Sequence, residues 1–520
     1  MYRVKIAVVA LLMTIMSGIP VCAEDGDDSR LVRGLHYGLE VQASLSDGAT
    51  PLWLNANKHG LSSLEAQNGY LRTSVCRPLE ADSMRQWAIG YGLDLAAPVH
   101  YTSSVVVQQF YADVRWKRLL LSVGTKEREM ELKDNELSSG SQTLGINARP
   151  VPQIRLEVPD YYTLPFARGW LHVKGHLSFG MMTDGKWQRG FAHQQGKYAD
   201  GVLYHSKAGY LMSGKKDARF KAELGLEMAA QFGGTAHNVF LSDGTGQTIQ
   251  GGRRFKDFLN VLVPGGNSEG QDVYLNVAGN HLGSWVARFS YETDAIALAA
   301  YMDKYFEDHS AMLFLDYDGY GKGPNWNRRE SNRFVFYPMK DVMIGGEVEL
   351  KRAEWLKKII VEYIYTKYQS GPIYHDHTTT ISDHLGGNDN YYNHYVYSGW
   401  QHWGQVIGNP LYRSPIYNSD GQIQVENSRF RAWHAGISGN LSNRFHYRLM
   451  ATFQNGLGTY SQPFNRKRHN VSMLAHAEYR FKTKLQGWSV GGSVGIDNGS
   501  ILGNNRGMQL TIKKTGVLGL

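Results

Sequence analysis

The chain has 520 residues, of which 42% are apolar and 20% charged, and its mean hydropathy of −0.38 argues against a protein that crosses a membrane as apolar helices. The formal net charge of +8 is a mild bias over this length, and no run of Lys and Arg resembles a nucleic-acid-binding arm, so nucleic acid is not an expected partner. Only Cys76 lies beyond the N-terminal leader, so we expect neither an internal disulfide nor a cysteine metal cluster.

The first 23 residues are typical of a secretory signal peptide. Basic Arg3 and Lys5 precede a short apolar run, and a small-residue cleavage site ends at Ala23. We therefore expect residues 1–23 to be removed and the mature protein to begin at Glu24. An uncleaved membrane anchor is the alternative, and the shortness of the apolar run disfavours it.

Residues 220–232, FKAELGLEMAAQF, alternate strictly between apolar residues and charged or small ones. Successive side chains of a strand point to opposite faces, so this segment predicts a strand with one apolar face. We expect Leu224 and Leu226 to face lipid and Glu223 and Glu227 to face the lumen of a barrel.

The same alternation recurs to the end of the chain, in segments of about the length that a tilted strand needs to cross a bilayer. Glycine, Asn and Asp clusters separate these segments, and the 58 glycines leave room for material packed inside a barrel. Residues 24–520 therefore predict an all-β fold, a transmembrane antiparallel β-barrel in the cell outer membrane. A soluble multi-sandwich protein is the alternative, but it needs a linker that the sequence lacks. The further predicted strands lie at 87–95, 171–179, 359–366, 445–454, 471–481, 488–496 and, least regularly, 507–518.

Three irregular segments interrupt the strand pattern, near residues 46–66, 134–168 and 253–264. Prolines exclude regular central strands from the second segment, and the third spaces its apolar residues at helical intervals. Because all three carry apolar residues that need burial, we expect them to form a small helical or irregular plug, inside the lumen or across the periplasmic end.

Several phrases resemble the outer-membrane capsule-assembly Wzi family and occur in that family's order. They are WLNANKHGLSSLEAQNGYLR, LSSGSQTLGINARPVPQIRLEVPDYYTLPFARGW, GNHLGSW and YYNHYVYSGWQHWGQVIGNPL, with YGLDLA, VQQFYADV, VGTKE and KDFLNVLV between them. The resemblance implies a monomeric barrel of about eighteen strands with a helical plug near its periplasmic end. It also implies a non-enzymatic lectin that anchors capsular or exopolysaccharide at the cell surface. The chain departs from many such barrels by ending on Leu520 and not on an aromatic residue.

Residues 374–403 form the most polar and aromatic stretch of the chain, and we expect an exposed loop that contacts the polysaccharide. Sugar rings stack on aromatic faces, while amide, carboxylate and imidazole groups bind hydroxyls. The alternative role of these aromatic side chains is packing within a loop or at a membrane interface. The candidate polysaccharide-binding residues are Tyr391, Tyr392, Trp400, His402 and Trp403.

The same loop contains His375, Asp376, His377, Asp383 and His384, residue types that bind zinc. Their spacing matches no metalloenzyme signature, and a flexible polar loop explains them as well, so we predict no metal site and no cofactor. The DYDGYG sequence at 316–321 lacks the later acidic ligand of an EF-hand and predicts an ordinary turn.

No Gly-x-Ser-x-Gly, His-Glu-x-x-His or phosphate-binding loop occurs, so we expect no catalytic residues. Lumen carboxylates such as Glu223, Glu227 and Glu478 are interpreted as charge networks that brace the wall against the plug. Two alternatives to the polysaccharide anchor remain: a diffusion channel for sugars or ions, and an enzyme that modifies lipid or glycan. The expected partners are polysaccharide and outer-membrane lipids, with no second subunit.

Overall fold

The computed structural model describes residue 32 and residues 34–518, except 83–84, 241–244, 264–278, 308–314, 317–323, 325–332, 335–340 and 375–384. The predicted signal peptide at 1–23, the five candidate zinc ligands between His375 and His384, and most of the DYDGYG turn lie outside these described residues. No helix of the described part is long and apolar enough to cross a membrane.

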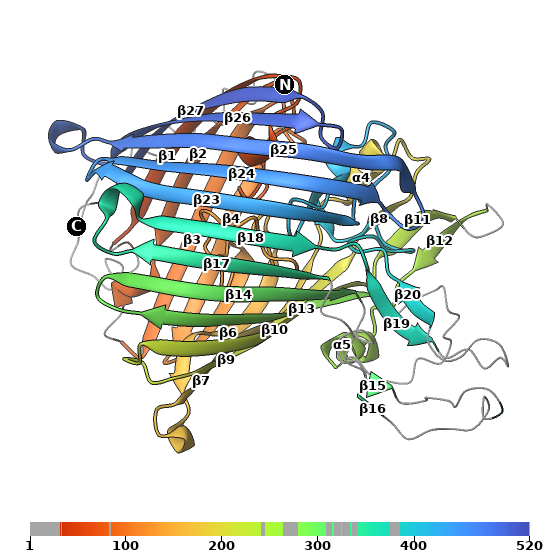
Figure 1. Ribbon diagram of the computed structural model, residues 1–520, viewed down its shortest axis with the longest axis horizontal. Helices are drawn as coiled ribbons and strands as arrows, with labels where there is room; N and C mark the ends of the chain where they lie inside the picture. The colour runs from red at the N-terminus through yellow and green to blue at the C-terminus, as the bar shows by residue number, and fades with distance from the viewer. Residues whose placement is uncertain are drawn as a thin grey trace.

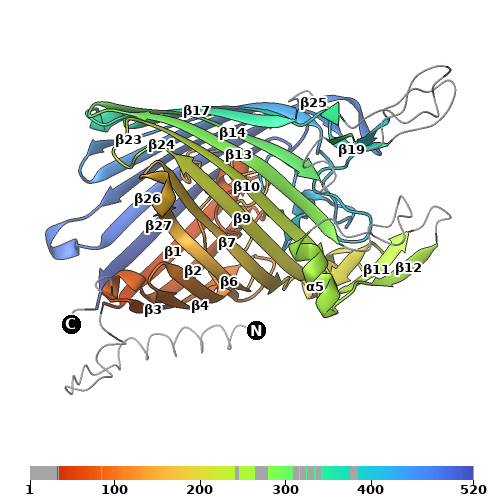
Figure 2. The same ribbon diagram turned by 90° about the horizontal axis from the view of Figure 1, so that it is seen from below.

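Eighteen antiparallel strands form one closed barrel (Figures 1 and 2). Strand β1 pairs with β2 on one side and with β27 on the other, where His36 lies opposite Val517, so the sheet has no free edge. The predicted transmembrane barrel and its last strand are confirmed. The barrel strands are β1 (His36–Asp47), β2 (Gln67–Arg77), β3 (Trp87–Val99), β4 (Val106–Trp116), β5 (Leu119–Thr125), β6 (Gln153–Thr163), β7 (Leu171–Met181), β9 (Leu203–Ser213), β10 (Phe220–Phe232), β13 (Asn280–Glu292), β14 (Ile296–Glu307), β17 (Val342–Leu350), β18 (Lys358–Tyr365), β23 (Phe430–Ser442), β24 (Phe445–Gly458), β25 (Pro463–Arg480), β26 (Trp488–Gly499) and β27 (Asn505–Val517).

Smaller elements lie in the connections between the barrel strands. A three-stranded sheet and three two-stranded ladders occur among the described residues, together with three short α-helices. The strands of these sheets are β8 (Tyr198–Asp200), β11 (Thr235–Phe240), β12 (Gly246–Gln250), β15 (Leu315–Asp316), β16 (Arg333–Phe334), β19 (Ser370–Tyr374), β20 (Leu385–Asn388), β21 (Gln401–His402) and β22 (Gln405–Val406). The helices are α3 (Leu52–Asn55), α4 (Gly185–Phe191) and α5 (Phe255–Leu262).

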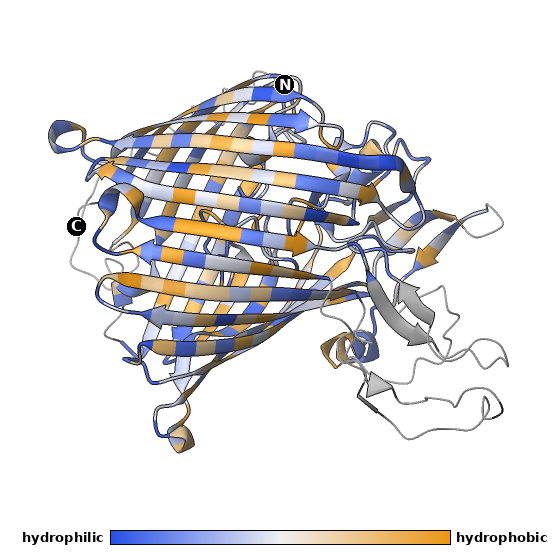
Figure 3. Ribbon diagram, viewed as in Figure 1, coloured by the Kyte–Doolittle hydropathy of each residue, from blue (hydrophilic) through white to orange (hydrophobic). Residues whose placement is uncertain are grey.

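The faces of the wall follow the predicted alternation. On β10, Leu224 is 49% exposed on the outer surface, whereas Glu227 is 1% exposed and accepts a hydrogen bond from the Tyr210 hydroxyl of β9 (2.8 Å). Apolar and polar residues alternate in bands along the barrel strands in Figure 3. An apolar exterior around a polar interior is the arrangement that a lipid bilayer requires of a barrel, and the protein is an outer-membrane barrel.

The two ends of the barrel differ in their connections. At the end where β1 begins and β27 ends, strands are joined by short turns, such as residues 117–118 between β4 and β5. At the opposite end the connections are long, including residues 366–429 between β18 and β23. Bacterial outer-membrane barrels have short periplasmic turns and long extracellular loops, which assigns the long connections to the extracellular end.

Three of the long connections fold back into the lumen, and we name them the first (48–66), second (126–152) and third (389–429) inner segments. Leu54 of the first inner segment packs directly against Gly495 of β26. A Cβ added to Gly495 would lie only 2.7 Å from Leu54 Cγ, so no larger residue fits there. Leu137 of the second occupies the corresponding space at Gly436, where an added Cβ would lie 3.1 Å away from Leu137 Cβ. Glycines on the wall therefore make room for the plug, as the composition predicted.

Two predicted plug boundaries are wrong. The second irregular segment was expected to run from 134 to 168, but residues 153–163 form barrel strand β6. Pro159 is tolerated in this strand because pairing with β5 ends at Glu157, and the register with β7 shifts between Val158 and Tyr162. Pro159 therefore lacks a backbone N–H at a place where the hydrogen bonding of β6 to its two neighbours is already interrupted.

The third expected plug segment, 253–264, does not enter the lumen. Helix α5 lies against the outside of the wall beside β7, β9 and β10 (Figure 2). The helical spacing was interpreted correctly, but both faces of this short helix are apolar, and the periodicity alone does not say which side of the wall it covers. The inner segments enter from the extracellular end and lie in the lumen, which is one of the two positions expected for the plug. The second inner segment reaches the short-turn end, where Asp134 pairs with Lys358 at the start of β18 (2.6 Å).

Candidate functional site

The candidate sugar-binding aromatics lie inside the barrel, in the third inner segment. Tyr391, Tyr392 and Trp400 are at most 1% exposed and belong to the main apolar core. The Trp400 indole donates to the backbone oxygen of Thr143 (2.9 Å) and stacks on Tyr204 of the wall, with ring centroids 5.8 Å apart. These rings therefore hold the plug to the barrel.

The remaining two candidate residues have protein partners as well. His402 is 1% exposed, and its Nδ1 lies 2.8 Å from the backbone oxygen of Arg149. Trp403 is half-buried, and the Arg149 guanidinium lies 4.4 Å from its ring centroid. His402 is inaccessible to a sugar ring, and Arg149 of the second inner segment covers one face of the Trp403 ring. The predicted glycan-binding surface is therefore corrected to an internal packing site for every candidate except the half-buried Trp403.

The third inner segment is also joined to the other two by hydrogen bonds. Gln405 donates to Ser62 Oγ of the first inner segment (2.8 Å). Asn147 of the second donates to the backbone oxygen of Val406 (2.9 Å), and Asn409 donates to that of Gly140 (2.8 Å). These side-chain hydrogen bonds join the three inner segments into a single plug inside the lumen.

Charged groups connect this plug to the barrel wall. Lys133 of the second inner segment forms a buried ion pair with Asp303 of β14 (2.8 Å). Five residues along, Ser138 donates to Glu362 of β18 (2.6 Å), which also accepts a hydrogen bond from Tyr301 (2.6 Å). Asp303 and Glu362 of the wall therefore brace the plug, and the charged partner, Lys133, was not singled out by the sequence. Of the carboxylates named for this role, Glu227 accepts a hydrogen bond from Ser141 of the second inner segment (3.4 Å). Glu223 and Glu478 instead have partners within the wall.

The second inner segment begins with a charged run, KEREMELKD, directly after β5. Gly124 near the end of β5 has φ +119°, and a Cβ there would lie 2.1 Å from the backbone oxygen of Phe110. Glycine is thus required where the chain leaves the wall and turns into the lumen. The strong alternation of charge after a strand is the sequence signal that could have drawn attention to this run.

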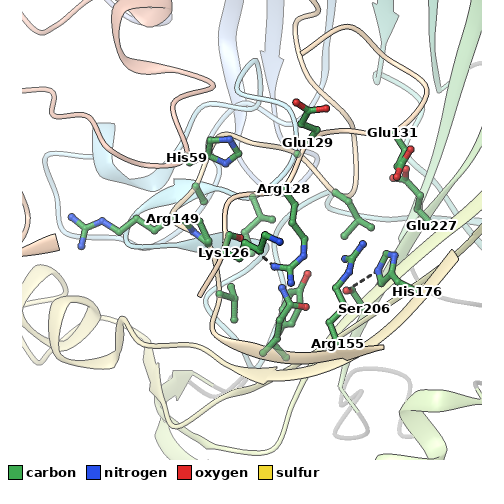
Figure 4. A pocket seen from close by; sticks show the side chains of 18 of the residues that line it. His59, Lys126, Arg128, Glu129, Glu131, Arg149, Arg155, His176, Ser206 and Glu227 are labelled. Atoms are coloured by element: carbon green, nitrogen blue, oxygen red, sulfur yellow. Dashed lines mark hydrogen bonds between the residues drawn. The ribbon is translucent and has the colours of Figure 1, made fainter. Parts of the chain in front are cut away.

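A cavity of about 100 Å³ lies between the charged run and the wall (Figure 4). Lys126 and Arg128 line it from the second inner segment, and Arg155 and His176 line it from β6 and β7. The Arg128 guanidinium donates to Ser122 Oγ (3.1 Å) and, among the described residues, forms no ion pair. Burial and the nearby Arg155 together lower the pKa of Arg128 from 12.5 to about 10, although Glu157 and Asp113 act in the opposite direction.

A second cavity, of about 270 Å³, lies on the inner side of β1 to β4. Glu127 lines this cavity, whereas its neighbours Lys126 and Arg128 line the first. Arg72 of β2 forms ion pairs with both Asp94 (2.6 Å) and Glu127 (3.1 Å). The charged run therefore forms a polar partition between two cavities that are each large enough for several water molecules.

No group of three or more His, Cys, Asp or Glu side chains suited to a metal ion occurs in the described ranges. The cavity-lining groups are instead cations and carboxylates from several elements, most of them ion-paired. Such an arrangement can solvate and orient a polar solute, because it presents both donors and acceptors to a confined aqueous space.

Comparison of the sequence with family models and with curated proteins finds no match. Among solved structures, OccAB4 of Acinetobacter baumannii is 8% identical, with a TM-score of 0.43, over 94% of this chain and 100% of that one. OprD of Pseudomonas aeruginosa is 9% identical, with a TM-score of 0.43, over 94% and 96%. OccK9 of Pseudomonas aeruginosa is 8% identical, with a TM-score of 0.46, over 93% and 98%. At these identities the shared property is the barrel fold.

The polysaccharide-anchoring function that the sequence resemblance implied is corrected by the positions of its candidate residues. Tyr391, Tyr392, Trp400 and His402 are buried in the plug, and Trp403 is half-buried against Arg149.

Proposed function

We propose that this protein is a selective diffusion channel of the outer membrane for small polar solutes. The observation that carries the proposal is the position of the charged run at the start of the second inner segment. Lys126 and Arg128 line one lumen cavity, and Glu127 between them lines another. Solutes would pass from one aqueous space to the other beside this partition.

The partition favours a narrow and selective path over a wide pore. Glu127 is held by the Arg72 guanidinium (3.1 Å) and by the Gln108 amide (2.7 Å), while Lys126 is held by Asp113 (2.5 Å). Groups fixed in this way select by charge and hydrogen-bonding geometry, as rings of charged side chains do in other channels. A small unitary conductance is therefore expected.

The proposal includes no catalytic step and no second subunit. The wall closes through β1 and β27 within a single chain, so a monomer satisfies all of its barrel strands. Membership of the capsule-assembly Wzi family is retained as a proposal that rests only on the sequence phrases, without the anchoring activity.

The test is conductance in planar bilayers and swelling of liposomes in small sugars, amino acids and dicarboxylates. The purified protein should give small, stable conductance steps. The Arg72→Gln/Glu127→Gln variant should enlarge them at least twofold, because it removes the ion pair that fixes the partition. Arg480→Gln/Glu478→Gln is the matched control, since this pair lies at the short-turn end with Arg480 65% exposed.

Two results would reject the channel. One is solute entry no faster than in protein-free liposomes, for both the purified protein and the Arg72→Gln/Glu127→Gln variant. The other is an equal rise in conductance for Arg72→Gln/Glu127→Gln and for the Arg480→Gln/Glu478→Gln control. That result would show that the current does not pass the partition.

A further inference from the structure

Helix α5 is attached to the outer surface of the barrel wall near its extracellular end (Figure 2). The Phe258 ring lies 5.4 Å from Phe179 of β7 and 5.1 Å from Phe232 of β10, measured between ring centroids. At the last turn of the helix, Lys207 of β9 donates from Nζ to the backbone oxygen of Val261 (3.0 Å). A lysine at this position also complements the negative end of the helix.

The part of the wall beneath α5 is unusually polar for an outer face. On β9, Tyr204 and Tyr210 face the lumen, so His205 and Lys207 point outward, toward the membrane side. The His205 ring packs against Phe179 at 4.5 Å, and His205 is only 1% exposed. Helix α5 therefore covers two polar side chains that would otherwise face lipid.

On the side directed away from the wall, helix α5 has an exposed apolar face. Phe255 is 78% exposed, Leu259 46% and Val263, which follows the last turn, 69%. Residues spaced by four lie on the same side of a helix, so these three side chains form one stripe directed away from the wall. The stripe is continuous with the apolar outer surface of the barrel, where Leu211 of β9 and Leu224 of β10 are also exposed.

Basic side chains cluster at the start of the helix. Arg253, Arg254 and Lys256 are exposed, while the neighbouring Asp257 carboxylate accepts a hydrogen bond from the backbone nitrogen of Arg254 (2.7 Å). Asp257 is thus used to begin the helix, and Arg253 donates to the backbone oxygen of Gly201 (2.8 Å). Arg254 and Lys256 form no ion pair within the described part of the chain, so they can bind an anion. An apolar stripe beside a cluster of cations is the pattern of a helix that lies in a membrane interface.

We propose that α5 binds lipopolysaccharide of the outer leaflet, with Phe255, Leu259 and Val263 among the acyl chains and Arg254 and Lys256 on the lipid phosphates. The leaflet follows from the position of α5 at the end with long connections. The lipid class follows from the pairing of exposed cations with an apolar stripe that is continuous with the wall. This site does not depend on the proposed channel.

The charge part of the proposal is tested by lipopolysaccharide binding to protein in phosphatidylcholine nanodiscs, measured by native mass spectrometry. Arg254→Gln/Lys256→Gln should bind about 30-fold more weakly, from the loss of two lipid-facing cations. Lys215→Gln/Lys216→Gln is the matched control, because these exposed lysines lie in the turn at the other end of β9 and β10. Heat-dependent gel mobility shows that each variant forms a folded barrel.

Equal losses in the two charge variants would overturn the site. So would an equally strong interaction of the purified protein with phosphatidylglycerol nanodiscs, because it would assign the cations to anionic lipid in general and not to lipopolysaccharide.

The apolar part is tested with a nitroxide label at Leu259→Cys in a Cys76→Ser background. The label should be relaxed by oxygen, which concentrates in acyl chains, and protected from a water-soluble nickel chelate. A label at Leu485→Cys serves as the control, because Leu485 is 49% exposed in a turn at the opposite end. Free access of the nickel chelate to the Leu259 label would show that α5 stays in water and would refute membrane insertion.

Discussion

Lys133 and Asp303 form an ion pair of 2.8 Å in which both side chains are at most 1% exposed, one on the second inner segment and the other on β14. Asp303 Oδ2 also accepts a hydrogen bond from the backbone nitrogen of Gln142 (2.9 Å), so one wall carboxylate orders both ends of a ten-residue stretch of the plug. The stability of the barrel therefore depends on the contacts between Asp303 and the second inner segment.

Breaking this pair should destabilise the protein strongly. Asp303→Asn leaves the Lys133 ammonium buried without its counter-charge, and we expect a loss of about 3–5 kcal/mol in the free energy of unfolding. The measurement is reversible urea unfolding in phospholipid vesicles. The control is Glu292→Gln, which breaks an exposed pair with Lys351 (2.6 Å) and should cost less than about 1 kcal/mol. Comparable losses in the two variants would contradict the role assigned to burial.

A charge on the lipid-facing wall should be costly only within the membrane. Leu224→Arg places a cation on the outer face of β10, and we expect it to lower the free energy of unfolding in vesicles by about 2–4 kcal/mol. Leu485→Arg is the matched control, because both leucines are 49% exposed but Leu485 lies in a turn. If both variants unfold at the same urea concentration, Leu224 does not face the bilayer.

The half-buried Lys58 should make stability depend on pH. Burial and the nearby Arg448 lower the pKa of Lys58 from 10.5 to about 7, although Glu40 acts in the opposite direction. Between pH 7 and 10.5 the unfolded chain binds the proton that the folded protein lacks, so stability should rise with pH by up to about 1.4 kcal/mol per unit.

The comparison of unfolding free energies at pH 7 and pH 9 tests this assignment. Lys58→Met should be more stable than the parent at pH 7 and should lose this part of the rise. Lys215→Met, at an exposed turn, should keep the parent's pH dependence. Parallel curves for Lys58→Met and the parent would show that Lys58 is charged in the folded protein throughout this range.

Trp400 should behave as a core residue. Trp400→Ala removes a fully buried indole and its hydrogen bond to Thr143, and we expect a loss of about 3–5 kcal/mol in unfolding free energy. Trp355→Ala is the control, because Trp355 is 63% exposed in a turn and its removal should cost much less. A folded Trp400→Ala protein as stable as the parent would contradict the packing seen here.

Local periodicity determined the wall. The alternation of residues 220–232 predicted both the bounds of β10 and the direction of Leu224 and Glu227, because strand geometry alone sends neighbouring side chains to opposite faces. The same reasoning predicted the segments that leave the wall, because they lose the two-residue period while keeping apolar residues. It also related the abundance of glycine to material packed in the lumen.

Only the tertiary structure decided what the irregular segments contact. Trp400 and Phe255 are both aromatic residues outside the barrel strands, yet Trp400 is completely buried in the lumen and Phe255 is 78% exposed on the outside. No local pattern separates them, because the difference depends on Thr143 and Tyr204 for one and on the outer wall of β7, β9 and β10 for the other. The sequence specifies apolar area that must be covered, whereas the closed barrel decides whether protein or lipid covers it, because closure separates an inner surface from an outer one.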